Sequence, residues 1–347
     1  MKEFSINTLI RENIKTMKPY SSARDEFKDL DENIIFLDAN ENPNENGVNR
    51  YPDPQQKTLK SALSGIKRIP ENKILLGNGS DEVLDLLFRA FCEPNVDNVI
   101  TLPPTYGMYG VLANLNAIQN REVLLNESFE PQVDKILSQV DKNTKIIFLC
   151  SPNNPTGNSF PDESIVTLLQ NFNGIVVLDE AYIDFSNKES WLQEINDYPN
   201  LVITQTLSKA YGMAGIRLGI LYASQEIIAV LNKIKPPYNV NILTQSKALN
   251  NFENQEVIKN QILEIKEQRN LIYGQLLNTS FVKEIYKTDA NFLLCKVDDA
   301  NKRYNQILEK GIVIRNRTKD ALCENCLRIT IGTAAENQKL IQVLKSL

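Results

Sequence analysis

Lys209 is the residue whose surroundings most strongly indicate chemistry. It lies in the stretch T-L-S-K-A-Y-G-M-A-G-I-R-L-G, between an apolar, β-prone segment and a glycine-punctuated turn. Lysine is rarely placed among apolar residues without a reason. An amine held in a dry pocket loses its proton readily and can form a Schiff base with a carbonyl. The pattern favours pyridoxal phosphate chemistry.

The chain contains no histidine. This excludes Ser-His-Asp and Cys-His catalysis and any imidazole metal site. Proton transfer must then fall to Lys, Tyr, Asp or Glu. Cys323 and Cys326 form a Cys-x-x-Cys pair, but a structural zinc site would need a second ligand pair. We interpret them as two ordinary thiols, and we expect no metal.

A glycine-rich turn, Gly77-Asn-Gly-Ser80-Asp81-Glu82, stands where an apolar stretch gives way to a predicted helix. Ser80 is expected to be the N-cap, and helix N-termini bind phosphate through free N–H groups. A plain capped helix start is the alternative. The turn is not a P-loop, because no Gly-Lys-Ser/Thr follows.

Two further turns follow predicted strands. Ser151-Pro-Asn-Asn154-Pro-Thr-Gly157 comes after one strand, and Asp179-Glu-Ala-Tyr182 comes after the next. Turns at the carboxyl ends of parallel strands are where α/β proteins bind ligands. A carboxylate there could hold a cofactor's ring nitrogen protonated, and Tyr182 could donate to an oxygen. A structural turn and a solvated acid pair remain the alternatives for these two segments.

The elements that must position these residues alternate between strands and helices. Apolar strand candidates are 99–102, 122–125, 146–150, 175–178, 201–204 and 218–222, with an amphipathic helix at 81–91 and another beginning at Pro161. This alternation predicts an α/β fold with a mainly parallel sheet covered on both faces. After Pro237 the pattern changes to long polar helices through about Leu277, then strands at 291–297, 311–314 and 327–331 and a terminal helix. We expect an N-terminal arm (1–36), a larger cofactor-binding domain (37–237) and a smaller C-terminal domain (238–347).

The bulk composition describes an ordinary water-soluble protein. A net charge of −5 argues against non-specific nucleic-acid binding. Apolar runs are interrupted before membrane-spanning length, and the N-terminus lacks a signal-peptide pattern. Five scattered cysteines fit a reducing compartment, so we expect a cytoplasmic location.

Taken in order, these motifs resemble the fold-type-I pyridoxal phosphate enzymes of the aspartate aminotransferase superfamily, over nearly the whole chain. The resemblance implies pyridoxal 5′-phosphate bound as an aldimine on Lys209, with Asp179 partnering the ring nitrogen. It implies that the other cofactor contacts come from the residues Ser80, Asp81, Tyr106, Asn154, Tyr182, Ser208 and Arg217. Catalytic roles would fall to Lys209, Asp179 and Tyr182.

Further motifs narrow the resemblance. Leu37-Asp-Ala-Asn40-Glu-Asn-Pro43, Tyr51-Pro-Asp53, Pro103-Pro-Thr-Tyr-Gly-Met-Tyr109 and Cys326-Leu-Arg328-Ile-Thr-Ile-Gly-Thr333 resemble the histidinol-phosphate aminotransferase family. This implies a homodimer in which Tyr51 reaches the neighbouring subunit's cofactor phosphate. It also implies that Arg328 binds the glutamate carboxylate, and that Arg315, Tyr20 and Asn40 help with the substrate phosphate or carboxylate. The expected reaction is a transamination in histidine biosynthesis, in which glutamate gives its amino group to imidazole-acetol phosphate and the products are histidinol phosphate and 2-oxoglutarate.

Three alternatives remain on the sequence alone. An aromatic or broad-range aminotransferase, or a phosphate-substrate decarboxylase, would keep the same cofactor residues. A non-catalytic relative acting as a regulatory or interaction module is an alternative of a different class, although the intact Lys209 argues against it.

Overall fold

A seven-stranded sheet forms the centre of the computed structural model, which describes residues 4–20 and 35–347. Its strand order is β1-β7-β6-β5-β4-β2-β3. Neighbours from β3 through β6 pair in parallel, whereas β7 is antiparallel to both β6 and β1. The predicted mainly parallel α/β sheet is confirmed. The strands are β1 (Ile74–Asn78), β2 (Asn98–Thr101), β3 (Gln119–Glu122), β4 (Thr144–Cys150), β5 (Ile175–Asp179), β6 (Leu201–Thr206) and β7 (Leu218–Tyr222).

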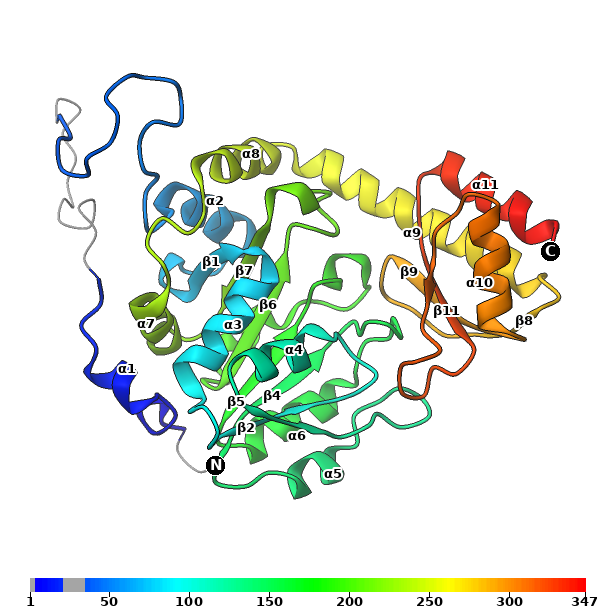
Figure 1. Cartoon of the computed structure of the whole chain (residues 1–347), viewed down its shortest axis with the longest axis horizontal. Helices are drawn as coiled ribbons and strands as arrows, with labels where there is room; N and C mark the ends of the chain where they lie inside the picture. The colour runs from blue at the N-terminus through cyan, green and yellow to red at the C-terminus, as the bar shows by residue number, and fades with distance from the viewer. Residues whose placement is uncertain (1–3, 21–34) are drawn as a thin grey trace.

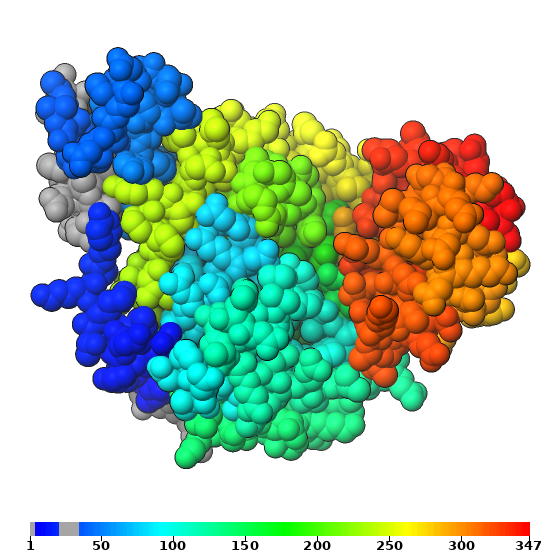
Figure 2. Space-filling model, viewed as in Figure 1, coloured from blue at the N-terminus to red at the C-terminus, as the bar shows by residue number. Residues whose placement is uncertain are grey.

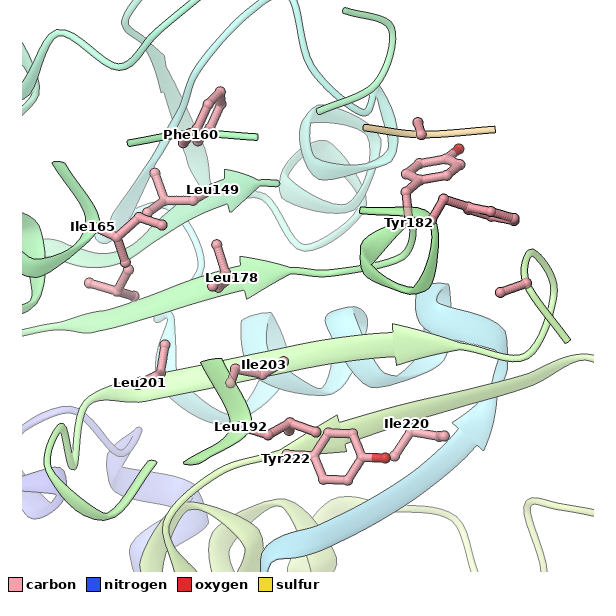
Figure 3. Packing of buried hydrophobic residues seen from close by; sticks show 14 of the residues in the cluster. Leu149, Phe160, Ile165, Leu178, Tyr182, Leu192, Leu201, Ile203, Ile220 and Tyr222 are labelled. Carbon is pink, nitrogen blue, oxygen red and sulfur yellow. The ribbon is translucent and has the colours of Figure 1, made fainter. Parts of the chain in front are cut away.

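Helices cover both faces of this sheet, because its strands are apolar on both faces. Alternate residues of β4 enter two different cores: Leu149 belongs to one and Phe148 to the other. Figure 3 shows the first core, with Leu149, Leu178 and Ile203 side by side on successive strands. That core is covered by α2 (Lys57–Lys67), α5 (Val133–Ser138), α6 (Asp162–Asn171) and α8 (Ile242–Phe252); the other by α1 (Glu12–Thr16), α3 (Gly79–Phe91), α4 (Met108–Leu115) and α7 (Gln225–Ile234).

A second, antiparallel sheet follows in the C-terminal part, ordered β10-β11-β9-β8. It has its own apolar core, shared with three helices, and it lies beside the first sheet (Figures 1 and 2). The long helix α9 runs between the two regions in Figure 1. The elements are α9 (Gln255–Leu277), β8 (Val282–Ile285), β9 (Phe292–Val297), α10 (Ala300–Glu309), β10 (Arg315–Asn316), β11 (Cys326–Thr330) and α11 (Ala334–Lys345).

Short 3₁₀ turns connect several of these elements. They are η1 (Ile6–Thr8), η3 (Glu71–Lys73), η4 (Ile183–Phe185), η5 (Trp191–Asn196) and η6 (Ala214–Ile216). Within residues 4–20 and 35–347, no helix combines the length and apolarity needed to cross a membrane.

Several predicted boundaries were wrong, mostly at sheet edges. Strand β3 ends at Glu122, where the sequence predicted a strand to begin, and 311–314 forms no strand. Strands β1 and β8 were not predicted. Edge strands such as β3 and β8 carry polar and charged residues, so hydrophobic patterning misses them. Ser80 is not an N-cap: α3 begins at Gly79 with Asn78 as its cap.

The described part of the N-terminal arm packs on its own subunit. Arg11 donates its backbone N–H to the Ala90 carbonyl at 3.1 Å and its Nη1 to the Arg89 carbonyl at 3.0 Å. These contacts fix α1 against the end of α3. Residues 21–34 of the arm lie outside the described residues, and its packing on a partner stays a prediction.

Candidate active site

A cavity of about 650 Å³ lies at the carboxyl ends of the parallel strands and extends to the second sheet. It collects most of the predicted site, because parallel strands place the turns that follow them at one edge of the sheet. The predicted residues that line it are Ser80, Asp81, Tyr106, Asn154, Asp179, Tyr182, Ser208, Lys209, Arg217, Arg315 and Arg328. Residues separated by nearly 250 positions are thereby brought together.

Lys209 follows β6 in a tight turn that exposes its side chain to the cavity. The Gly212 N–H donates to the Lys209 carbonyl at 3.0 Å and shapes this turn. The sequence predicted a dry pocket, and this was wrong: Lys209 is exposed, since the cavity is open. Partial burial and the nearby Arg328 still lower the pKa of its amine. A lowered pKa favours the neutral amine, which is the form that attacks a carbonyl.

Asp179 ends β5 and is almost fully buried. It accepts a hydrogen bond from the Tyr109 hydroxyl at 2.6 Å and another from the Ala181 N–H at 3.2 Å. Burial raises its pKa, and the two donors oppose that rise. A buried carboxylate without a counter-ion is costly, so a cationic ring nitrogen facing Asp179 would supply the charge that the pocket lacks.

The start of α3 and Arg217 form a compact anion cradle. Gly79 has φ +78°, and a Cβ there would come within 2.5 Å of the Arg217 Nη2. A Cβ on Gly219 would come within 2.3 Å of the Gly79 backbone. The two glycines therefore let β7 and the helix start approach closely, which places the Arg217 guanidinium beside helix N–H groups. A phosphate fits this combination of donors.

Acidic Asp81 moderates the charge of this cradle. Its carboxylate lies 3.6 Å from the Arg217 Nη2 and accepts a hydrogen bond from the Tyr106 hydroxyl at 3.0 Å. Burial and Asp81 together raise the pKa of Tyr106, so that hydroxyl stays a donor. Tyr106 also meets Tyr109 edge to face, with ring centroids 5.6 Å apart. The aromatic ring and the phosphate cradle are thus held in one arrangement.

Asn154 links the first sheet to the second. Its side-chain oxygen accepts a hydrogen bond from the Arg328 Nη1. The loop that carries it is fixed by Asn153, whose amide donates to the Pro104 carbonyl at 2.8 Å and to the Thr156 hydroxyl at 2.7 Å. Asn154 is consequently held in the lining of the cavity, which it shares with Lys209 and Asp179, and it bonds to Arg328 of the second sheet.

Three predicted residues do not enter this cavity. Tyr20 is exposed, and Asn40 and Tyr51 line a separate surface cavity instead. Tyr51 stacks on Tyr238 with ring centroids 4.5 Å apart. The resemblance assigned Tyr51 to a neighbouring subunit's site, so its distance from its own subunit's Lys209 does not conflict with that role.

Sequence reasoning missed three residues of the site. Tyr109 was seen only as part of a motif, and its bond to Asp179 spans 70 positions. Arg317 and Asp320 line the cavity beside Arg315. The spacing of Arg315 and Arg317 was a usable signal, because residues two apart on a strand share a face.

Comparison with known proteins shows which family the chain belongs to. The family model for aminotransferase class I and II matches residues 23–344. The histidinol-phosphate aminotransferase of Flavobacterium johnsoniae is 69% identical over 100% of both chains. The crystal structure of the histidinol-phosphate aminotransferase from Clostridium acetobutylicum superposes with a TM-score of 0.80 at 26% identity, covering 86% of this chain and 90% of that one. The chain belongs to the aminotransferase class I and II family.

With this family and with relatives that are histidinol-phosphate aminotransferases, the chain is a pyridoxal phosphate-dependent transaminase. A structure of the histidinol-phosphate aminotransferase from Sinorhizobium meliloti contains pyridoxal 5′-phosphate; it has a TM-score of 0.76 and 23% identity, over 86% of this chain and 83% of that one. In the present structure the amine of Lys209, the buried carboxylate of Asp179 and the cradle at Arg217 fit the aldehyde, ring nitrogen and phosphate of that cofactor.

Proposed function

We propose that this chain transfers an amino group between histidinol phosphate and 2-oxoglutarate in histidine biosynthesis, as a cytoplasmic enzyme. The observation that carries the proposal is the set of cations facing Lys209 across one cavity, Arg315 and Arg328 among them. Both substrates, histidinol phosphate and glutamate, carry an anion remote from the reacting amine. Arginine binds carboxylate and phosphate alike through its planar fork, and the names of the close relatives support the substrate choice.

Each residue has a physical role in this reaction. Bound pyridoxal phosphate supplies an electron sink for the charge left when the substrate carbon loses its proton. Lys209 Nζ removes and returns that proton, since the chain has no imidazole to do so. Asp179 keeps a proton on the ring nitrogen, Asn154 and Tyr182 donate to the ring oxygen, and Tyr106 packs near the ring.

The anchoring groups act at the two ends of the site. Ser80, Asp81 main chain, Ser208 and Arg217 hold the cofactor phosphate. Arg328 binds the carboxylate of glutamate, with Arg315 assisting at the substrate phosphate or carboxylate. Tyr20 and Asn40 do not line this cavity in their own subunit, so they would assist there only from a second subunit.

We also propose that the enzyme is a homodimer with shared active sites, in which Tyr51 completes the partner's phosphate cradle. The surface around Tyr51 supports this, since Val48, Tyr51 and Leu243 expose apolar side chains there. The proposed division into an arm (1–36), a cofactor-binding domain (37–237) and a smaller domain (238–347) is supported by the core that the second sheet shares with α9, α10 and α11. The boundary is not a clean one, because Phe252 of α8 and Phe292 of β9 pack in the core of the first sheet.

The test uses the purified enzyme loaded with pyridoxal phosphate. The visible absorption of the lysine-bound cofactor should bleach on adding histidinol phosphate or glutamate, and not on adding phenylalanine or threonine phosphate. Lys209→Ala should abolish turnover while the far-ultraviolet circular dichroism stays unchanged. Absence of visible absorption would contradict the enzyme assignment, and equal bleaching by phenylalanine would favour a broad-range aminotransferase.

A further inference from the structure

The second sheet gathers positive charge at the outer end of the cavity. Arg315 on β10 pairs with Arg328 on β11 in antiparallel register. Arg317 follows two positions later, and its backbone N–H donates to the Cys326 carbonyl at 2.8 Å, which continues the ladder. All three side chains line the same cavity. Like charges on directly opposed strand positions are destabilising, so this arrangement needs an anion to balance it.

Arg317 is held in place by an ion pair with Asp320, but its guanidinium has a hydrogen-bond donor without an acceptor. Its Nη2 lies 2.5 Å from the Asp320 carboxylate, as a close ion pair without hydrogen-bond alignment. The Asp320 N–H donates to the Arg317 carbonyl at 2.9 Å and closes the turn between them. Within residues 4–20 and 35–347, the buried Nε atoms of Arg317 and Arg328 have no hydrogen-bond partner. Buried donors of this kind are costly unless a ligand completes them.

The charge balance indicates which ligand fits. Three guanidinium groups less the Asp320 carboxylate leave two positive charges at this end of the cavity. A phosphate monoester carries about −1.5 to −2 charges at neutral pH and has three acceptor oxygens. A single carboxylate carries one charge and is satisfied by one bidentate arginine. Glutamate has two carboxylates, but they are on different carbons, and each needs only one bidentate arginine. The cluster therefore exceeds the needs of either carboxylate at one position and matches those of a phosphate, which concentrates its charge on a single group.

We propose that Arg317, positioned by Asp320, is the residue that makes this site prefer a phosphate-bearing amine over its unphosphorylated counterpart. The inference rests on the proposed function, whose substrate residues were Arg315 and Arg328. Arg317 adds the donors that a dianion requires beyond those needed by a carboxylate. Because Arg315 and Arg328 already offer one guanidinium for each carboxylate of glutamate, loss of Arg317 affects the half-reaction of the phosphate-bearing amine and spares that of glutamate.

The experiment compares one substitution across three substrates. Single-turnover bleaching of the holoenzyme is measured for Arg317→Gln with histidinol phosphate, with histidinol and with glutamate. We expect kcat/KM for histidinol phosphate to fall about 10- to 100-fold, as for a lost charge-assisted bond. Values for histidinol and glutamate should change by less than about threefold, since neither needs the extra donor. An equal fall for all three, or no fall for histidinol phosphate, would overturn the proposal.

The matched control is Arg121→Gln. Arg121 also pairs with an aspartate, at 2.7 Å from Asp141, and its side-chain exposure of 25% is close to the 24% of Arg317. It does not line the cavity, so its substitution should leave all three substrates unaffected.

A binding measurement separates this inference from the proposed function. Inorganic phosphate is titrated into the holoenzyme by calorimetry, and Arg317→Gln should weaken its binding about tenfold, whereas Arg121→Gln should not. Phosphate binding that depends on Arg317, in an enzyme that ignores histidinol phosphate, would contradict the proposed substrate and keep the anion site. Phosphate binding unchanged by Arg317→Gln would refute the site itself.

Discussion

Single hydrogen bonds set the properties of Asp179. The Tyr109 hydroxyl is fully buried and donates to this carboxylate at 2.6 Å. Because burial raises the pKa of Asp179, each donor matters in keeping it ionised. An ionised Asp179 is what holds the ring nitrogen protonated. Tyr109 therefore acts on the reaction through another residue and is a positioning residue.

Tyr109→Phe should slow the reaction and shift its pH dependence. Removing the donor raises the pKa of Asp179, and the carboxylate then gains a proton at higher pH. We expect kcat to fall about 10- to 100-fold, as for the loss of a hydrogen bond to a charged group. The acid limb of the pH profile of kcat should move to higher pH. Steady-state rates measured across pH, at saturating cofactor, test both effects.

Tyr222→Phe is the matched control for this change. Tyr222 is also fully buried, but its hydroxyl has no hydrogen-bond partner within the described part of the chain. Removing it should leave the pH profile unchanged. A Tyr109→Phe enzyme with the wild-type acid limb would show that Asp179 does not depend on this bond.

At the scale of elements, the junction between β1 and α3 requires a glycine at position 79 because of its backbone angle and its contact with Arg217. Gly79→Ala adds a methyl group within 2.5 Å of Arg217 at a positive φ, which is strained for alanine. We expect a loss of about 1 to 3 kcal/mol in the free energy of unfolding. Cofactor affinity should fall as Arg217 is displaced. Denaturant titration and cofactor titration measure the two effects.

Gly65→Ala gives the opposite expectation and serves as the control. Gly65 lies inside α2, and a Cβ there would meet nothing within 4 Å. Alanine is favoured over glycine in a helix interior, so stability should rise by about 0.5 to 1 kcal/mol. If both substitutions behaved alike, the close approach at Gly79 would not be the cause.

Helix α2 also carries a buried charge, on Lys60. Burial, reinforced by Lys235, lowers the pKa of Lys60 to about 8. Below pH 8 the folded state holds a protonated lysine at a cost. This cost disappears as the pH rises from about 8 toward the ordinary lysine value of about 10.4. The group therefore destabilises the fold at neutral pH and ceases to do so at high pH.

Lys60→Met should consequently stabilise the protein at pH 7, by about 1 to 3 kcal/mol. The gain over wild type should shrink between pH 8 and about pH 10. Urea unfolding at several pH values measures the difference. Lys57→Met, on an exposed position of the same helix, should change stability by less than about 0.5 kcal/mol at any pH. A gain that did not depend on pH would point to packing and not to charge.

How far the sequence predicts these elements depends on burial. The central strands were found because both of their faces are apolar; the prediction of a strand at 218–222 matches β7. Among the proposed cofactor residues, Asn154, Asp179 and Tyr182 were singled out because they follow predicted strands in short turns. Lys209 and Ser80 were singled out by the glycine-containing turns around them, and the others came with the family resemblance. Arg317 and Tyr109 were missed, since their partners are set by register and long-range packing. Asp179 and Tyr109 meet only once α4 packs beside the sheet.

At the scale of the whole molecule, the position of Tyr51 separates two arrangements. Tyr51 lines a surface cavity distinct from the one that contains Lys209. In Figure 1 its segment lies in the blue loop near α2 and α8, well away from the β10–β11 region that contributes Arg315 and Arg328. Either Tyr51 plays no part in catalysis, or it serves the site of a second subunit. Only a dimer allows the second arrangement.

A hybrid dimer distinguishes these arrangements. Tyr51→Phe removes the hydroxyl but keeps the ring that stacks on Tyr238. This substitution should weaken cofactor binding about tenfold or more, as for the loss of a hydrogen bond to a phosphate.

In a purified heterodimer of a Tyr51→Phe subunit and a Lys209→Ala subunit, only one site retains Lys209. If sites are shared, that site receives Tyr51 from the Lys209→Ala subunit. Its activity should then saturate at the wild-type cofactor concentration. If Tyr51 acts within its own subunit, saturation should match the Tyr51→Phe homodimer. The two variant subunits carry different affinity tags so that the heterodimer can be purified. If the two chains did not co-purify, the dimer would be excluded, because an isologous interface must accept either variant equally.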